Sequence, residues 1–421
     1  MSNHVPSTRG QCVEADASDP LGAFRDRFQL PEGVIYLDGN SLGALPKNTL
    51  ARVGRTITDE WGLGLIRSWN DASWFTKPTD VGDRIAPLVG AASGEVVVAD
   101  STSASLFQVL VSALRMRPDR SVVVSERDNF PTDLYMIQGT QELLAGADRD
   151  LDRRLIHDDG PSLDEVLADD VSAVVLTHVN YRTGRMYDMA AVAEKVHAAG
   201  ALVIWDLCHS VGAVPVDLNA ADADFAIGCT YKYLNGGPGS PSFLWVPARH
   251  QDAARPALTG WQGHAKPFDF TVDYEPAPGI TRFRVGTPQL LSLAGLEASL
   301  DVWADVDMQA VRTKSLALTD LFIALVETRL AAYDLEIVTP RDHDRRGSQV
   351  SLRIDGGYQI MQALIARGVI GDFRAPDLMR FGFTPLYLGY ADVWDAVSVL
   401  EEILTSGVWQ DERFARRGAV S

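Results

Sequence analysis

Residues 201–237 read ALVIWDLCHSVGAVPVDLNAADADFAIGCTYKYLNGG. Two apolar runs, Ala201 to Trp205 and Phe225 to Thr230, are separated by Gly, Pro and Asp residues, and this pattern predicts two buried strands of a parallel sheet. Asp206 directly follows the first run, and Lys232 follows the second. Because the carboxyl ends of parallel strands line the ligand crevice of an open α/β sheet, we expect both side chains to face one crevice.

An acid and a lysine in one crevice suit an enzyme that uses pyridoxal 5′-phosphate (PLP). The lysine amine forms a Schiff base with the cofactor aldehyde, and the carboxylate keeps the pyridine nitrogen protonated. Taken singly, Asp206 also fits a turn residue and Lys232 also fits a solvated edge charge. Tyrosines flank Lys232 on both sides, and the segment 235–240 reads NGGPGS. Such glycines let the backbone approach a ligand closely, which favours the binding site.

The composition is that of an ordinary soluble globular protein. The chain has 421 residues, of which 46% are hydrophobic and 22% are charged, so two or three domains are expected. Its net charge of −18 argues against a nucleic-acid partner or an anionic membrane. No apolar run reaches about 18 residues, so we expect no membrane span.

The three cysteines, Cys12, Cys208 and Cys229, have neither the number of a disulfide framework nor the spacing of metal ligands. They suit a reducing cytoplasm, and no metal site is predicted. The start, MSNHVPSTRG, lacks the charged and apolar regions of a signal peptide. Residues 1–20 are polar, and we expect them to be frayed.

Strand and helix patterns alternate from about residue 95 to 245, which predicts an α/β fold with a mainly parallel central sheet. Two long helical patterns follow, and the later strands and helices suggest a small α+β domain. We therefore expect an N-terminal segment that packs with the small domain (1–50), a large domain (51–304) and a small C-terminal domain (305–421).

Several further positions are candidates for binding. Ser101 and Thr102 open a predicted helix, where they would serve as a cap and would also bind a phosphate group. Asn40 and Ser41 belong to a Gly-rich turn, which is either a plain strand-to-helix turn or a loop that closes over the site. Arg380 lies in a Phe- and Gly-containing strand, where it would grip a carboxylate rather than form a surface ion pair.

The motifs resemble those of kynureninases, PLP enzymes of aminotransferase fold type I, over nearly the whole chain. The matching stretches are YLDGNSLG (36–43), FPTD (130–133), WDLCHSVG (205–212), YKYLNGG (231–237), GW (260–261), MRF (379–381) and PLY (385–387). Each stretch occurs elsewhere by chance, but the set in this order is specific. The resemblance implies a large PLP-binding domain, a small domain and a homodimer with sites near the subunit interface.

The reaction implied by the resemblance is hydrolytic cleavage of the Cβ–Cγ bond of L-kynurenine, which gives anthranilate and L-alanine in tryptophan catabolism. Lys232 would be the Schiff-base lysine and proton shuttle, and Tyr231 would protonate the departing fragment. The implied cofactor-binding residues are Ser101, Thr102, Phe130, Asp133, Thr177, Asp206, His209, Tyr231, Lys232, Trp261 and Thr287. The implied substrate-binding residues are Arg380, Trp69, Asn40 and Ser41.

The resemblance also bears on the substrate. Family members that prefer 3-hydroxykynurenine tend to have His and Asn near the substrate ring, and the corresponding places here are held by Trp69 and Thr287. Trp and Thr offer fewer partners to a ring hydroxyl. We therefore expect plain kynurenine to be the better substrate.

Three other readings stay open from the residues alone. A cysteine desulfurase or related lyase would need a nucleophilic Cys on a mobile loop late in the chain, whereas the last cysteine is Cys229, inside a predicted strand. An aminotransferase would form pyruvate from an amino donor. A PLP-binding module without catalysis would have lost Lys232, Asp206 or the carboxylate-binding arginine, and all three are present.

Overall fold

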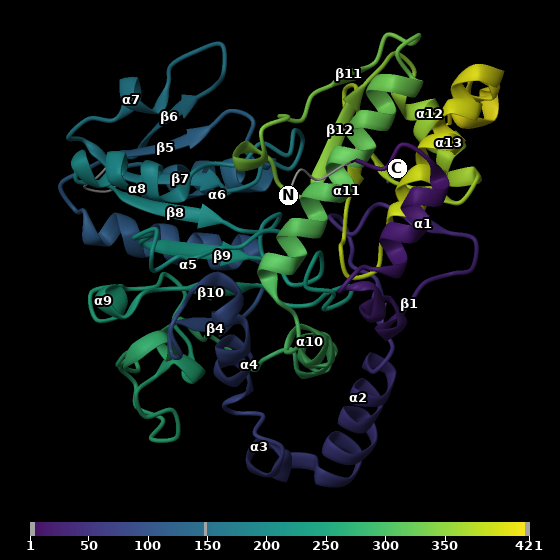
Figure 1. The fold of residues 1–421 in the computed structure, drawn as a ribbon. Helices are drawn as coiled ribbons and strands as arrows, with labels where there is room; N and C mark the ends of the chain where they lie inside the picture. Colours follow the sequence, from purple (N-terminus) through teal and green to yellow (C-terminus); the bar gives the residue numbers. More distant parts are fainter. Residues whose placement is uncertain (1–4, 147–149, 417–421) are drawn as a thin grey trace.

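The computed structural model describes residues 5–146 and 150–416 (Figure 1). A seven-stranded sheet forms the centre of the large domain, in the order β4-β10-β9-β8-β7-β5-β6. Its strands are β4 (Val96–Val98), β5 (Val122–Glu126), β6 (Asp152–Ile156), β7 (Val171–Thr177), β8 (Leu202–Asp206), β9 (Phe225–Gly228) and β10 (Phe243–Trp245). Neighbours from β9 to β6 run parallel, and β10 runs antiparallel to both β9 and β4. The predicted α/β fold with a mainly parallel sheet is confirmed.

Alternate side chains of β4, β5, β7, β8, β9 and β10 enter two separate apolar clusters on the two faces of the sheet. On β8, for example, Val203 and Trp205 belong to one cluster, while Leu202 and Ile204 belong to the other. This is the two-residue period of a strand that is buried on both faces. The helices of this domain are α4 (Lys77–Ile85), α5 (Thr102–Met116), α6 (Pro131–Leu144), α7 (Leu163–Val166), α8 (Met189–Ala198) and α9 (Ala248–Gln251).

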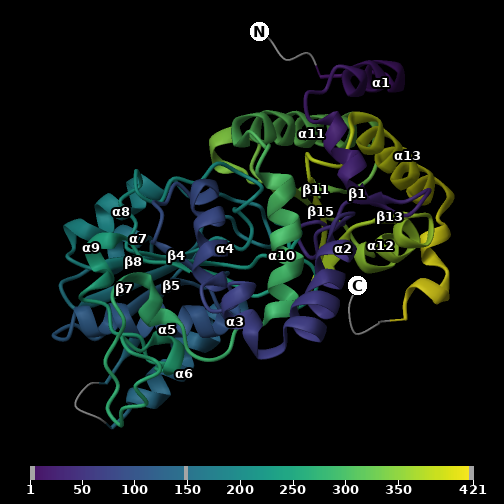
Figure 2. The same ribbon diagram turned by 90° about the horizontal axis from the view of Figure 1, so that it is seen from below.

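The small domain is built on a second, antiparallel sheet in the order β11-β12-β15-β14. Its strands are β11 (Glu336–Ile337), β12 (Gln349–Arg353), β14 (Asp372–Arg374) and β15 (Leu378–Gly382), and its helices are α11 (Met308–Arg329), α12 (Gly357–Ala366) and α13 (Tyr390–Ser406). In Figure 2, α10 (Leu290–Trp303) lies between the two domains, whereas α11 lies over the small sheet and packs against β12. Division at residue 305 remains our proposal.

The N-terminal segment crosses to the small domain. Helix α1 (Arg9–Ala17) packs against α13, as Figure 2 shows from below. Strand β2 (Ile35–Tyr36) pairs in parallel with β13 (Val369–Ile370), and β1 (Phe28–Gln29) pairs with β3 (Leu45–Pro46). The expectation that residues 1–20 are frayed is wrong for α1. Residues 1–4, which the same expectation includes, lie outside the described part of the chain.

A helical arm follows, consisting of α2 (Thr49–Arg55), a π-helix (Thr56–Gly64) and α3 (Ser68–Asp71). Arg52 connects the arm to α10. Its guanidinium contacts Glu60 of the π-helix at 2.8 Å and Glu297 of α10 at 2.6 Å. Short 3-10 helices occur at Gly22–Arg27, Leu65–Arg67, Ala86–Val89, Trp261–Gly263, Gly279–Phe283, His343–Arg345, Val408–Gln410 and Glu412–Phe414. None of the helices in residues 5–146 and 150–416 combines the length and the apolar character that a membrane crossing requires.

Candidate active site

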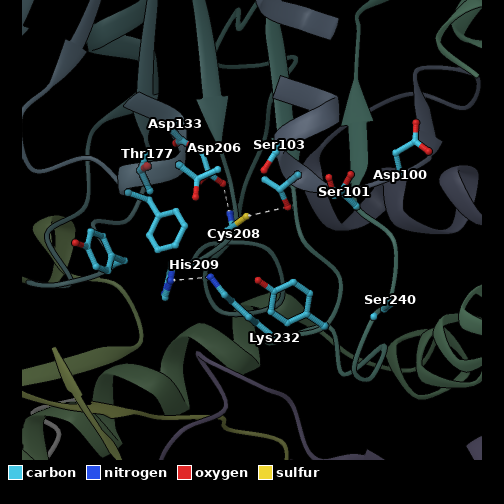
Figure 3. A pocket seen from close by; sticks show the side chains of 17 residues that line it. Asp100, Ser101, Ser103, Asp133, Thr177, Asp206, Cys208, His209, Lys232 and Ser240 are labelled. Carbon is cyan, nitrogen blue, oxygen red and sulfur yellow. Dashed lines mark hydrogen bonds between the residues drawn. The ribbon is translucent and has the colours of Figure 1, made fainter. Parts of the chain in front are cut away.

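A cavity of about 420 Å³ opens at the carboxyl ends of β7, β8 and β9 (Figure 3). Thr177 ends β7, Asp206 ends β8, and the strand register pairs these two residues directly. Lys232 follows β9 in a loop and lines the same cavity, so the expectation that Asp206 and Lys232 face one crevice is confirmed. The predicted cofactor residues in its wall are Ser101, Thr102, Phe130, Asp133, Thr177, Asp206, His209, Tyr231 and Lys232.

The amino group of Lys232 sits in the middle of this cavity. Its Nζ atom lies 3.0 Å from Nε2 of His209, 5.9 Å from the centre of the Phe130 ring and 5.8 Å from the centre of the Tyr231 ring. The rings of Phe130 and Tyr231 therefore border the Lys232 amine, at distances that leave room for a flat ligand beside it.

Two buried carboxyl groups lie across the cavity from the lysine. Asp206 accepts a hydrogen bond from the Cys208 backbone N–H at 2.7 Å, and Asp133 lies in the first turn of α6. Burial raises the pKa of Asp206, and burial together with the Asp206 charge holds the pKa of Asp133 well above its ordinary value. Asp133 Oδ2 is buried without a hydrogen-bond partner. A protonated ring nitrogen of a bound ligand would stabilise the ionised form of the carboxyl pair through its positive charge. Its N–H would also give the unpaired oxygen a hydrogen-bond donor.

The opposite end of the cavity suits an anion. Ser101 caps the 15-residue helix α5, where its Oγ accepts a hydrogen bond from Ala104 N at 3.4 Å. The first backbone N–H groups of a helix have no partner within the helix, and the helix dipole favours negative charge there. Ser103, Ser240 and Ser242 add hydroxyl groups to this wall. A ligand with a phosphate at one end and a ring nitrogen at the other, as PLP has, fits the two ends of the cavity.

His209 and Tyr231 complete the surroundings of the lysine. Burial, together with the positive charges of Lys232 and Arg380, holds the pKa of His209 well below its ordinary value, so the imidazole is neutral. Burial raises the pKa of Tyr231, so its hydroxyl keeps its proton at neutral pH.

The candidate set from the sequence left out one supporting residue, Asn129, and eight wall residues, which are Asp100, Ser103, Thr132, Tyr181, Cys208, Gly239, Ser240 and Ser242. Tyr181 lines the cavity, and its ring meets Phe130 edge to face with centroids 5.2 Å apart. Asn129 accepts a hydrogen bond from Thr177 and donates one to Ser125 at 3.1 Å. Its place directly before the FPTD stretch is a signal that could have found it, and Ser240 ends the NGGPGS segment that already favoured the binding site. Tyr181 comes from a loop whose course the pattern does not predict.

The predicted substrate residues Asn40, Ser41 and Arg380 lie together behind the cavity wall. Arg380, on β15, donates to Asp372 Oδ1 at 2.9 Å, to Ser41 Oγ at 2.7 Å and to the Tyr181 carbonyl at 2.8 Å. Its Nε and one Nη therefore hold Asp372. The other Nη is on the side of Tyr181, which faces the cavity.

The glycine-rich turn that carries Asn40 and Ser41 packs against the lysine loop. Gly43 N donates to the Tyr231 carbonyl at 2.8 Å, and a Cβ on Gly43 would lie 2.2 Å from the Lys232 carbonyl oxygen. This close approach excludes any side chain at Gly43 without movement of the loop. The turn is therefore part of the support of Lys232.

Three predicted residues lie away from the cavity of their own chain. Trp261 packs with Trp69, with ring centroids 5.7 Å apart, and Thr287 lies in the segment before α10. The cavity wall includes none of the three. A single chain thus does not bring Trp69, Trp261 and Thr287 together with Lys232.

The three thiols are buried and unpaired. Cys208 lines the cavity, and Cys229 donates toward the Cys208 carbonyl at 3.7 Å. None of them lies on an exposed loop, as the desulfurase reading would need. Among the described residues, no group of three His, Cys, Asp or Glu side chains is arranged to hold a metal ion.

Comparison with known proteins identifies a family. A family model described as the kynureninase C-terminal domain matches residues 311–400. The chain is 56% identical over 418 residues to a kynureninase of Burkholderia pseudomallei (strain 1106a), covering 98% of this chain and 100% of that protein. It is 53% identical over 419 residues to a kynureninase of Pseudomonas fluorescens, covering 99% and 100%.

Solved structures with low sequence identity share the fold. An apo cysteine desulfurase from Thermococcus onnurineus NA1 has a TM-score of 0.75 at 19% identity, covering 91% of this chain and 98% of that chain. A mutant of C-DES with glycine covalently linked to its PLP cofactor has a TM-score of 0.76 at 16% identity, covering 90% and 99%. The predicted fold type is confirmed.

The buried carboxyl pair predicts how the stability of the cofactor-free protein depends on pH. Both pKa values are raised on folding, so above the ordinary Asp pKa the folded chain binds more protons than the unfolded chain. The free energy of unfolding therefore falls as the pH rises through this range. Asp133→Asn removes one ionisable group and is expected to flatten the fall. Urea denaturation of cofactor-free protein at several pH values measures it.

Asp128→Asn is the matched control, because Asp128 lies in the loop just before α6 with its side chain half exposed. It is expected to keep the pH dependence of the wild type. If the free energy of unfolding of Asp133→Asn fell with pH as steeply as that of the wild type, the raised pKa of Asp133 would be contradicted.

Proposed function

The chain belongs to the kynureninase family, and from this membership we propose which of its residues carry the reaction. The enzyme is a PLP-dependent hydrolase that cleaves the Cβ–Cγ bond of L-kynurenine to give anthranilate and L-alanine. The observation that carries the assignment of roles is the cavity itself, where one lysine amine, a buried carboxyl pair and a helix N-terminus converge.

The residues that would hold the cofactor follow from the two ends of this cavity. Asp206 and Asp133 would hold the ring nitrogen, and Ser101 and Thr102 would bind the phosphate at the start of α5. Phe130 would stack on the ring. When bound, PLP supplies an electron sink for carbanion chemistry. The protein supplies orientation, burial and proton transfer around it.

Lys232 and Tyr231 are the proposed catalytic residues. The Lys232 amine is the covalent attachment point, and it is placed to remove and return protons because no other side-chain amine of the described residues lines the cavity wall. Tyr231 is a phenol whose proton is retained by burial, so it is suited to act as an acid toward the departing fragment.

Arg380 is the proposed site of the substrate carboxylate. Since Asp372 already occupies one edge of the guanidinium, the carboxylate would meet the Nη that now donates to the Tyr181 carbonyl. Ser41 contacts both Arg380 and Asp372, at 2.7 and 2.9 Å, and orients this pair. Asn40 lies beside it.

Lys232→Ala tests the catalytic assignment. The variant is expected to lose at least about 10²–10⁴-fold in kcat, because it lacks both the attachment point and the proton carrier. Anthranilate fluorescence and released alanine measure the reaction of purified protein with PLP and L-kynurenine. Lys47→Ala, at an exposed lysine, is the control and is expected to react like the wild type. Anthranilate from Lys232→Ala at the wild-type rate would refute the role.

The substrate preference is a second proposal. Trp69 and Thr287 offer few partners to a hydroxyl on the substrate ring, and burying an unpaired hydroxyl costs about tenfold in affinity. We expect kcat/KM for L-kynurenine to exceed that for 3-hydroxykynurenine by about this factor. Steady-state kinetics with both substrates on the same preparation decide it, and a clear preference for the hydroxylated compound would refute the proposal.

A homodimer would bring the distant residues to the site. Trp261 is 38% exposed and stands beside Phe268, while Phe270 and Val272 on the same loop are 84% and 102% exposed. Through Trp69, this loop adjoins the arm, on which Leu63, Leu65 and Ile66 are exposed. An apolar surface of this extent is typical of a protein contact. We propose a second copy as the occupant, with Trp261 and Thr287 completing the partner's cavity.

Hybrids of two inactive variants test this arrangement. In a dimer of Lys232→Ala with Trp261→Ala, one site would combine an intact Lys232 with an intact Trp261 from the other chain. Random reassembly is expected to restore about a quarter of the wild-type activity, because about half of the dimers are hybrids with one intact site.

Lys232→Ala mixed with Asp206→Ala is the control, because both residues line the cavity of the same chain and no hybrid site is intact. Recovery in neither mixture would place Trp261 outside the neighbouring site.

We also propose that the enzyme acts in tryptophan catabolism and is located in the cytoplasm. The three buried thiols, none in a disulfide, support this location.

A further inference from the structure

Arg284 is a buried arginine in the segment that leads to Thr287, and it is 4% exposed. Its Nε donates to Gln262 Oε1 at 3.1 Å, and one Nη donates both to that oxygen and to the Phe75 carbonyl oxygen. The guanidinium carbon also lies 4.8 Å from the centre of the Phe75 ring. One side chain therefore contacts two segments that are distant from it in the sequence.

The two acceptors of Arg284 are uncharged amide and carbonyl oxygens. Removing a cation from water is costly, and burial lowers the pKa of Arg284 to about 10. An apolar side chain of similar volume would avoid this cost. It could not, however, bind acceptors from two segments with one planar fork and also stack on an aromatic ring. The arrangement of those segments is therefore what the arginine provides.

Trp69 and Trp261 adjoin the two groups that Arg284 binds. The Trp69 carbonyl oxygen accepts a hydrogen bond from Phe75 N at 3.4 Å, and Trp261 directly precedes Gln262. The ring centroid of Trp261 lies 5.7 Å from that of Trp69 and 6.1 Å from that of Phe75. Both tryptophans are thus held next to a partner of the arginine.

The segment that carries Thr287 packs directly on the loop of Trp261. Gln262 N donates to the Val285 carbonyl oxygen at 3.3 Å, and a Cβ on Gly260 would collide with that same oxygen. Thr287 and Trp261 are exposed, whereas the arginine between their segments is buried. The two exposed side chains therefore stand on one surface that is fixed from inside.

Trp69, Trp261 and Thr287 thus form one packed group, the partner-facing unit. We propose that Arg284 is a positioning residue that holds this unit together, so that one chain presents it as a whole to the cavity of a second copy. The inference rests on the homodimer proposed above. In the described part of the chain, the cavity wall around Lys232 does not include Arg284. Loss of the arginine should therefore damage the partner's site and leave the cavity of its own chain intact.

Hybrid dimers distinguish this role from a general effect on folding. Arg284→Met is expected to lower kcat/KM of the homodimer about tenfold, because it loses hydrogen bonds from a charged group. Random reassembly with Lys232→Ala is expected to raise the activity to about a quarter of the wild type, since each hybrid combines an intact cavity with an intact unit. Reassembly with Trp261→Ala is the control and should give no gain over the parent variants, because both changes affect the same unit.

The outcomes separate this inference from the homodimer proposal. If Lys232→Ala recovers with Trp261→Ala but not with Arg284→Met, the shared site stands and the role of Arg284 is overturned. A gain from Arg284→Met with Trp261→Ala, or wild-type kcat/KM for Arg284→Met alone, would overturn it as well. Recovery in no mixture would remove the shared site and this role with it.

The arrangement of the unit is measurable without any activity. Full-length protein labelled with 5-fluorotryptophan gives a fluorine signal for each tryptophan, and Trp69→Phe and Trp261→Phe identify two of them. We expect Arg284→Met to shift both signals and to leave the signal of Trp205, which is fully buried on β8, in place. A variant that does not fold would shift the Trp205 signal too.

Two further variants make the comparison sharper. Arg284→Lys keeps the charge but lacks the fork, so it is expected to shift the Trp69 and Trp261 signals as well. Arg282→Met is the matched control, because Arg282 is 5% exposed and donates instead to the carbonyl oxygens of other segments, at 3.1 and 3.2 Å. It should leave both signals in place.

Wild-type positions of both signals in Arg284→Lys would overturn the proposal, because the charge alone would then suffice. If Arg284→Met does not fold, Arg284→Lys decides the question through the same signals and the same hybrid dimers.

Discussion

The parallel register of β7, β8 and β9 is the constraint on which the site depends. It pairs Thr177 with Asp206 and sets the chain after β9 beside them, so that Lys232 faces the acid across a cavity rather than solvent. These strands are buried on both faces, and a slip of one residue would move large apolar side chains to the wrong cluster. The position of the catalytic groups is therefore held by the packing of side chains that never touch a ligand.

The site concentrates groups that are costly to bury alone. Two carboxyl groups, a neutral histidine and a lysine share a small volume, and burial and neighbouring charges shift the pKa values of both carboxyl groups and of the histidine. A cofactor with a cationic ring nitrogen and an anionic phosphate complements this distribution at both ends. The cavity thus has the charge distribution that its ligand requires before the ligand binds. Burying these groups together lowers the stability of the ligand-free protein.

Much of this could be predicted from the sequence, because the strands have strong signals. The apolar runs before Asp206 and Lys232 predict buried parallel strands, and topology then requires that their ends meet. Helix α1 could not be predicted, since Cys12 is its one buried side chain and contacts with α13 hold it in place. Trp261 and Thr287 could be found by the resemblance to kynureninases, but their position relative to an active site depends on how two copies of the chain assemble.

The pairing of β2 with β13 affects the order in which the chain folds. Ile35 and Tyr36 are synthesised early, yet the strand that completes their hydrogen bonds begins at Val369. Contacts of such long sequence separation form late, because a large loop must close before they stabilise anything. During synthesis Ile35 and Tyr36 therefore lack the strand that completes their hydrogen bonds until almost the whole chain has emerged.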